Sequence, residues 1–249
     1  MQSDTQLNAK TRSSAPALHY ARADRRAYYV MKRGIDILLS LLLLAALAPL
    51  MLLIAIAIRV YSPGPVFFEQ RRVGAKRRTT SRGTLWQQTT FKCLKFRTMH
   101  VNADPSIHEA YVKALIKNDQ AGMASLQGKP TTLRKLVHDE RITRPGRLLR
   151  KLSLDELPQF FNVLRGDMSL VGPRPAIPYE VDAYSPRHLL RLQAQPGITG
   201  LQQITARSTA GFDDQVELDI RYIENQSLWL DIAIILKTPL VILSTRGAG

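Results

Sequence analysis

Two adjacent carboxylates, Asp155 and Glu156, could carry out chemistry on phosphorus. They lie in a leucine-rich stretch and follow closely after Arg150 and Lys151. A carboxylate can attack a phosphate ester and form an acyl phosphate, but an anion attacking an anion needs its charge neutralised. A divalent cation and arginines supply that neutralisation, and Mg²⁺ prefers carboxylate and phosphate oxygens as ligands. One carboxylate could therefore act on phosphorus while the other handles a proton or a metal ion, with Arg150 as a phosphate clamp.

Such a pair is, on its own, more often part of a solvated helix face, and three further segments favour a functional site. Residues 171–175 form a proline-fixed turn that presents Arg174. Residues 196–200 form a second tight turn, whose backbone N–H groups could cradle a phosphate. Residues 91–99 alternate cations with bulkier residues, which predicts a strand with its positive charges on one side. Those cations are Lys92, Lys95 and Arg97.

The overall charge points to an anionic partner. The 249 residues include 35 Lys and Arg against 20 Asp and Glu, a formal charge of +15. Nucleic acid, anionic lipid and a phosphorylated substrate all fit this charge, which cannot choose among them. The single cysteine, Cys93, excludes an internal disulfide and a CxxC metal knuckle. We find no internal repeat and no heptad pattern, so the sequence argues against a repeat protein or a coiled coil.

One segment is predicted to lie in the membrane. Between residues 37 and 58 only Ser40 is polar, and a helix of this length measures about 33 Å, enough for a hydrocarbon layer of roughly 30 Å. Pro49 lies near its midpoint, and basic residues flank both ends, which places both ends on the cytoplasmic side. We therefore predict a re-entrant helix-break-helix hairpin over residues 25–61, with a spanning helix as the alternative.

The remaining segments give the predicted organisation. Residues 1–24 are expected to be a flexible tail, and residues 62–249 a catalytic domain with a surface elaboration at 104–137. Residues 228–245 are expected to form a helix lying in the membrane interface, with a second span as the alternative. No strand-Gly-loop-helix nucleotide fingerprint is present. The predicted fold class is α/β and mainly helical: a small mixed catalytic body with a re-entrant membrane hairpin and interfacial amphipathic helices, and not a doubly wound sheet.

Taken together and in order, these motifs closely resemble the bacterial sugar transferase family, the monotopic phosphoglycosyl transferases. The resemblance covers most of the chain beyond the first 30 residues. It rests on seven stretches: residues 32–36, 62–68, 95–99, 153–159, 166–175, 196–200 and 230–231. The chain departs from the family pattern at the hairpin break, where Ala48-Pro49 replaces Ser-Pro. It also departs in the longer segments 79–90 and 104–137, and in the variant segment 201–207.

The resemblance implies a specific reaction. Sugar-1-phosphate would pass from a nucleotide diphosphate sugar, UDP-linked, to a polyprenyl (undecaprenyl) phosphate, releasing a nucleoside monophosphate. This would be the first membrane step of exopolysaccharide, O-antigen, capsule or glycoprotein glycan assembly. Asp155 would be the nucleophile and would hold Mg²⁺, the cofactor, while Glu156 would be the partner acid, acting as base or metal partner. The phosphate- and substrate-binding candidates are Arg150, Lys95, Arg97, Gln159, Arg174 and Arg207.

The resemblance also implies a location and partners. The protein would lie in the bacterial inner (cytoplasmic) membrane with its catalytic body on the cytoplasmic face, in contact with membrane lipids; we expect no nucleic-acid partner and leave a homodimer open. Two rival functions are kept. A basic, membrane-tethered nucleic-acid-binding protein explains the charge but not the carboxylate pair. A non-catalytic scaffold of glycan assembly predicts that Asp155 can be replaced without loss of glycan.

Overall fold

A computed structural model describes residues 25–80, 83–127, 139, 141–206 and 210–244. Within these residues the chain is mainly helical, with a long β-hairpin and one short parallel strand pair, so the predicted mixed, mainly helical class is confirmed. The helices are α2 (Arg26–Tyr61), α3 (Ser106–Ile116), α4 (Gln120–Gln127), α5 (Arg144–Lys151), α6 (Gln159–Arg165), α7 (Pro178–Val181), α8 (Pro186–Leu189), α9 (Leu201–Thr205), α10 (Phe212–Glu224) and α11 (Leu228–Leu243), with the 3₁₀ turns η1 (Leu154–Glu156) and η2 (Leu190–Leu192). The strands are β1 (Phe67–Thr80), β2 (Gly83–Phe96), β3 (Ser169–Val171) and β4 (Gly197–Thr199).

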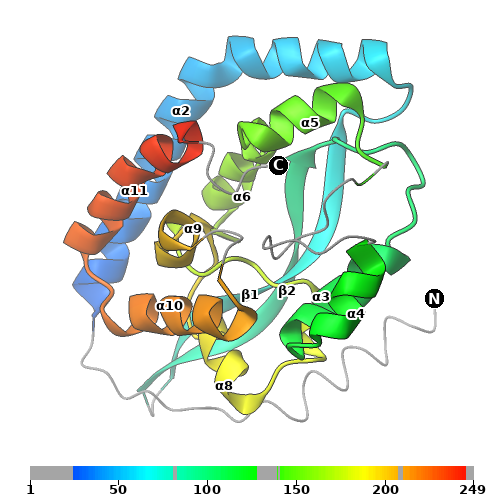
Figure 1. Cartoon of the computed structure of the whole chain (residues 1–249). Coiled ribbons are helices and arrows are strands. Elements are labelled where there is room, and N and C mark those ends of the chain that lie inside the picture. Colours follow the sequence, from blue (N-terminus) through cyan, green and yellow to red (C-terminus); the bar gives the residue numbers. More distant parts are fainter. Residues whose placement is uncertain (1–24, 81–82, 128–138, 140, 207–209, 245–249) are drawn as a thin grey trace.

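The apolar segment forms one helix, α2, which bends sharply part-way along its length (Figure 1). Pro49 lies inside it, and proline is the usual cause of a sharp kink because it removes one backbone hydrogen bond. The predicted break between two helices is therefore a bend in a continuous helix. Only 11% of an 18-residue apolar stretch of this helix is buried. The part of α2 that is long enough to cross a membrane is therefore largely uncovered by other parts of the protein. The re-entrant course stays a prediction.

The first limb of α2 is attached to the body by buried polar contacts. Lys32 Nζ lies 2.9 Å from Asp231 Oδ2 of α11, with both side chains less than a tenth exposed. Asp36 Oδ1 accepts a hydrogen bond from the backbone N–H of Leu170 at 3.0 Å. Arg33 donates to backbone carbonyls at the carboxyl end of α6, where helix carbonyls lack partners. Two of the basic residues that flank the apolar segment, Lys32 and Arg33, therefore bind protein groups.

Strands β1 and β2 pair antiparallel from Phe67 opposite Phe96 to Thr80 opposite Gly83. The segment 79–90 belongs to this hairpin apart from residues 81 and 82, which lie outside the described residues. Because side chains alternate between the faces of a strand, Lys95 shares a face with Arg72, while Lys92 lies on the other face beside Glu69. The sequence predicted that Lys92, Lys95 and Arg97 lie on one side of the strand, and this prediction is wrong for Lys92.

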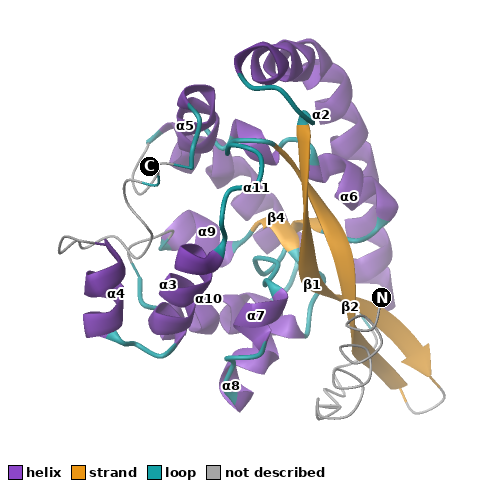
Figure 2. Cartoon of the chain, turned by 90° about the vertical axis from the view of Figure 1, so that its right-hand side faces the viewer, coloured by secondary structure: helices purple, strands orange, loops and turns teal. Residues whose placement is uncertain are grey.

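The main core lies between β2, α6, β3, α10 and α11. Asn162 of α6, which is fully buried, joins α6 to β2: its amide donates to the carbonyl of Lys92 at 2.7 Å and accepts from the N–H of Leu94 at 2.9 Å. Helices α3 and α4 form a second cluster with α10, on the side of the molecule away from the first limb of α2 (Figure 1, Figure 2). The described part of the 104–137 elaboration is therefore packed against the catalytic body.

Candidate active site

The 3₁₀ turn η1 positions the two carboxylates. Helix α5 ends at Lys151, and Ser153 takes a left-handed conformation with φ 55°, so the chain turns before the carboxylates. Arg150 and Asp155 therefore do not lie on one continuous helix. Asp155 is 8% exposed and the Glu156 side chain 24% exposed. The turn therefore gives the two neighbours different surroundings.

Glu156 is bound to a cation on the β-hairpin. Lys95 Nζ donates to Glu156 Oε1 at 2.7 Å, and both side chains are largely buried. Burial raises the pKa of Glu156, but the charges of Lys95, Arg174 and Arg72 outweigh it and lower that pKa to about 2. Glu156 is consequently ionised throughout the physiological range and is a weak base.

The pKa of Asp155 shifts in the opposite direction. Burial raises the pKa of this carboxyl, and the negative charge of Glu156 adds to the rise. The positive charges of Lys95 and Arg150 oppose it. A carboxylate that is poorly hydrated and only partly neutralised is a stronger nucleophile than a solvated one. Asp155 is thus the more reactive member of the pair once it is ionised.

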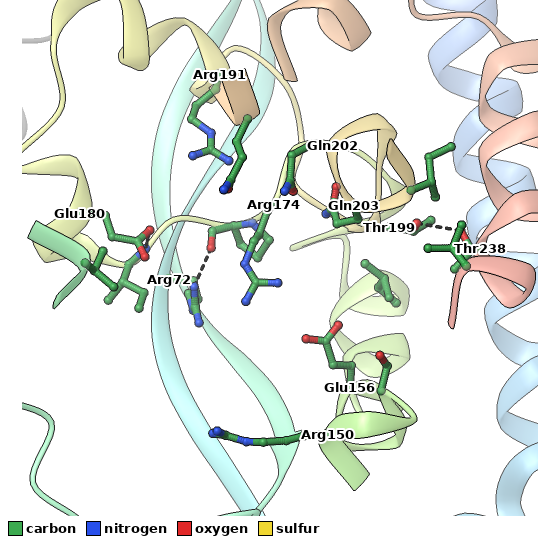
Figure 3. Close-up of a pocket in the computed structure, with 18 of the residues that line it drawn as sticks. Arg72, Arg150, Glu156, Arg174, Glu180, Arg191, Thr199, Gln202, Gln203 and Thr238 are labelled. Atoms are coloured by element: carbon green, nitrogen blue, oxygen red, sulfur yellow. Dashed lines mark hydrogen bonds between the residues drawn. The ribbon is translucent and has the colours of Figure 1, made fainter. Parts of the chain in front are cut away.

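A cavity of about 530 Å³ opens beside Glu156 (Figure 3). Its basic lining residues are Arg72, Arg150, Arg174 and Arg191. In Figure 3 the guanidinium of Arg174 points between Arg72 and Glu156. The volume is in the range of pockets that hold a small organic ligand, and four guanidinium groups match the charge of a diphosphate.

Several of these arginines are held in place by protein groups. Arg150 Nε donates to Thr98 Oγ1 at 2.9 Å, and Arg72 Nη1 donates to the carbonyl of Pro175 at 2.8 Å. Arg191 pairs with buried Asp219 below the cavity. A guanidinium that is already oriented loses less conformational freedom when it binds a phosphate. The cavity is therefore organised for anions before any ligand enters.

The structure brings most of the predicted site residues together. Arg150, Glu156 and Arg174 line the cavity, and Lys95 and Gln159 line a small recess that shares several of its walls. Arg97 lies outside both: its guanidinium donates to the carbonyls of Ser62 and Pro63 after α2. The remaining candidate, at position 207, lies outside the described residues. A phosphate-binding role for the position-97 side chain stays a prediction.

The turn at residues 196–200 has a structural use that the sequence did not show. The N–H of Gly197 donates to the carbonyl of Pro173 at 2.9 Å, and the N–H of Gly172 donates to the carbonyl of Thr199 at 2.9 Å. These bonds join β3 to β4, so the Gly197 N–H is not available as a phosphate donor. The turn instead fixes the position of Arg174, one residue beyond Pro173.

Comparisons with known proteins agree with this geometry. The family model described as bacterial sugar transferase matches residues 27–245. The chain belongs to the bacterial sugar transferase family. The resemblance stated from the sequence is thus confirmed, and the protein is a transferase.

Three relatives illustrate the family, and two of them are named for different sugars. The exopolysaccharide production protein ExoY of Sinorhizobium fredii is 37% identical over 97% of this chain and 100% of its own length. The UDP-glucose:undecaprenyl-phosphate glucose-1-phosphate transferase of Caulobacter vibrioides is 41% identical over 90% of this chain and 74% of its own. The undecaprenyl-phosphate galactose phosphotransferase of Salmonella typhimurium is 39% identical over 90% of this chain, which spans 43% of that longer protein.

The donor set of this sugar transferase suits a magnesium ion that arrives with substrate. The described residues contain no group of three or more His, Cys, Asp or Glu that could hold a metal. Glu156 is bound by Lys95, and Asp155, the residue before it, would supply the carboxylate. Mg²⁺ commonly uses one or two carboxylates together with substrate phosphates and water. The residues present therefore fit a substrate-bridged ion and not a closed protein site.

Proposed function

We propose that this sugar transferase moves sugar-1-phosphate from a UDP-linked sugar to undecaprenyl phosphate through a covalent aspartyl intermediate. The observation that carries the proposal is the pair of adjacent carboxylates, Asp155 and Glu156, whose pKa values shift in opposite directions. Glu156 lines the arginine-rich cavity, and Asp155 is the residue before it in the turn η1. Such divergence between two neighbouring titratable groups is typical of a site that assigns them different roles.

In the first step the Asp155 carboxylate attacks the phosphorus attached to the sugar. A new P–O bond forms to Asp155, and the bond from that phosphorus to the bridging oxygen breaks. The nucleoside monophosphate leaves with the bridging oxygen and its electron pair. Arg174 and Arg150, both on the cavity wall, would bind the diphosphate oxygens as charge shifts toward the leaving group.

In the second step an oxygen of undecaprenyl phosphate attacks the phosphorus of the intermediate. The P–O bond to Asp155 breaks, the carboxylate is regenerated, and the product is a lipid-linked diphosphate sugar. A phosphate monoester has a second pKa of about 6, so the acceptor is largely dianionic at neutral pH and needs no strong base. Glu156, with its lowered pKa, would serve to hold the ammonium of Lys95 beside the phosphates.

Magnesium is proposed as the cofactor. Asp155 would hold the ion together with diphosphate oxygens, and the ion would supply further neutralisation of phosphate charge. This chain's own contribution to neutralisation comes from the cations around the carboxylates, which would also keep Asp155 ionised. Those cations are Lys95, Arg72, Arg150 and Arg174.

The inner membrane, with the catalytic body on its cytoplasmic face, is the proposed location. Nucleotide sugars are soluble, whereas the acceptor exposes only its phosphate at the membrane surface. Helix α2, bent and largely uncovered by protein, would enter and leave one leaflet, and α11 would lie in the interface with Trp229, which is 83% exposed. The relatives are named for different sugars, so the donor sugar is left to experiment.

The test is release of nucleoside monophosphate from a panel of nucleotide diphosphate sugars, with purified protein, Mg²⁺ and undecaprenyl phosphate. Wild type should release it with one or a few donors, and Asp155→Asn should not. Asp167→Asn is the matched control, because that carboxylate forms a partly exposed surface pair with Lys76. Equal release by wild type and Asp155→Asn would refute the covalent mechanism, and no release with any donor would favour a scaffold.

A further inference from the structure

Helix α11 has two apolar faces with different surroundings. Leu236, Leu240 and Leu243 are each about 70% exposed. Thr238, Val241 and Ile242 instead line the cavity. At 3.6 residues per turn these two sets point in opposite directions around the helix axis. One helix therefore separates a bare apolar surface from the interior of the active-site cavity.

The cavity wall on this side is mainly apolar. Besides α11 it includes Leu157, which follows η1, together with Phe160 of α6, Ile198 of β4 and Ile204 of α9. Phe161 of α6 is also 40% exposed. Monomeric soluble proteins rarely expose contiguous apolar surface on this scale, and it marks contact with a membrane or a partner.

The opposite wall is built from α3, α7 and α10 and is mixed in character. Its polar side chains include His108, Glu180 and Gln215, and its apolar side chains include Tyr111, Val112, Leu115 and Phe212. The first turn of α10 carries Asp213 and Asp214, whose negative charge would repel anionic headgroups. Helices α3 and α4 lie on the side of the molecule away from the first limb of α2 (Figure 1, Figure 2).

We infer that the inner face of α11 binds the phosphate-proximal isoprene units of the lipid acceptor. The inference rests on the proposed function, because it assigns the acceptor of that reaction. An occupant with an anionic head and an apolar chain matches what this half of the cavity offers: guanidinium groups of Arg72 and Arg174 beyond an apolar wall that ends in Val241 and Ile242.

The proposed two-step reaction allows a sharp test, because only the second step uses the lipid. Ile242→Trp would fill the acceptor half of the cavity, whereas Leu243→Trp makes the same kind of change on the exposed face. Without lipid, both variants should release about one equivalent of nucleoside monophosphate per enzyme, as wild type does. With lipid, Ile242→Trp should raise the KM for acceptor by about tenfold or more, with little change in the KM for donor.

Two results would overturn the inference. One is wild-type turnover by Ile242→Trp, and the other is an equal loss in Leu243→Trp. If Ile242→Trp loses both steps, Ile242→Ala decides between the alternatives. A raised KM for the acceptor with intact release of nucleoside monophosphate supports the site, and an unchanged KM for the acceptor refutes it.

Failure of the proposed function would look different, since wild type would then release no nucleotide. Thermal stabilisation of detergent-solubilised protein by undecaprenyl phosphate, compared between wild type and Ile242→Trp, tests the lipid site without any reaction. Stabilisation of wild type alone supports the site, and equal stabilisation of both proteins, or of neither, refutes it.

Discussion

Removing the ammonium group of Lys95 should move the acid limb of the activity profile to higher pH. Its Nζ lies 2.7 Å from Glu156, and it is the leading positive charge that opposes the effect of burial on Asp155. At an effective dielectric constant of about 20, Coulomb's law gives roughly 6 kcal/mol of attraction at this separation, before the cost of desolvating both groups. Lys95→Met removes that attraction and leaves two adjacent carboxylates with fewer cations.

The sign of the effect follows from the role of Asp155, which must be ionised to attack. Activity is present above its pKa and is lost as pH falls through it. Loss of a nearby opposite charge raises a carboxyl pKa by about 1 to 3 units, and each unit corresponds to about 1.36 kcal/mol, or a tenfold rate change on the acid limb. Lys95→Met should therefore shift the acid limb upward by about 1 to 3 units.

The assay is nucleoside monophosphate release between about pH 5 and 9 for wild type and three variants. Lys95→Arg keeps the charge and should retain most of the wild-type profile. Lys92→Met is the matched control: Lys92 lies on the same strand and pairs with Glu69 at 2.8 Å, but these side chains are 74% and 50% exposed. That variant should resemble wild type. An acid limb at the same pH in Lys95→Met and Lys92→Met would refute the electrostatic reasoning.

Three further predictions concern stability and membrane placement. Lys32→Met should destabilise the protein by about 3 to 5 kcal/mol, because it leaves the buried carboxylate of Asp231 without its cation. Lys76→Met, which breaks a more exposed ion pair, should cost less than about 1 kcal/mol. Thermal unfolding measures both losses of stability, and equal losses would contradict this reasoning. Gly197→Ala should abolish activity and lower the melting temperature, since a Cβ there would overlap backbone atoms of the facing turn, while Gly34→Ala, with open space around it, should do neither. Pro49→Ala should straighten α2 and move one flank of the helix to the other side of the membrane. Labelling of cysteines introduced in both flanks measures on which side each flank lies. If the flanks of the unmutated helix lie on opposite sides, the re-entrant course is refuted.

The sequence predicted the long apolar helix and the mainly helical class, because long apolar runs leave a strong local signal. It could not predict that α2 continues through Pro49, since a proline allows either a kink or a break and the surroundings decide. It also gave no sign that Lys32 forms a buried ion pair. Its buried partner, Asp231, lies about two hundred residues later, and no local pattern links residues so far apart.

The candidate site was predictable where the residues lie in rigid local motifs. Arg150, Glu156 and Arg174 were found because each adjoins a turn or a capped helix end. Arg72 was missed among ten basic residues between positions 59 and 100, although strand alternation places it opposite Phe91 and on the face of Lys95. Arg191 gave no signal, because its place beside the cavity depends on how η2 packs against α10.

The adjacency of the two carboxylates has a physical consequence that neither residue would have alone. Consecutive residues of a 3₁₀ turn point in directions about 120° apart, so one residue can face a cation while its neighbour faces the interior. Glu156 is directed at Lys95, and its pKa is lowered; Asp155 is buried, and its pKa is raised. The left-handed residue Ser153, which lies between the end of α5 and η1, redirects the chain before the two carboxylates, so it helps to set the surroundings in which their pKa values diverge.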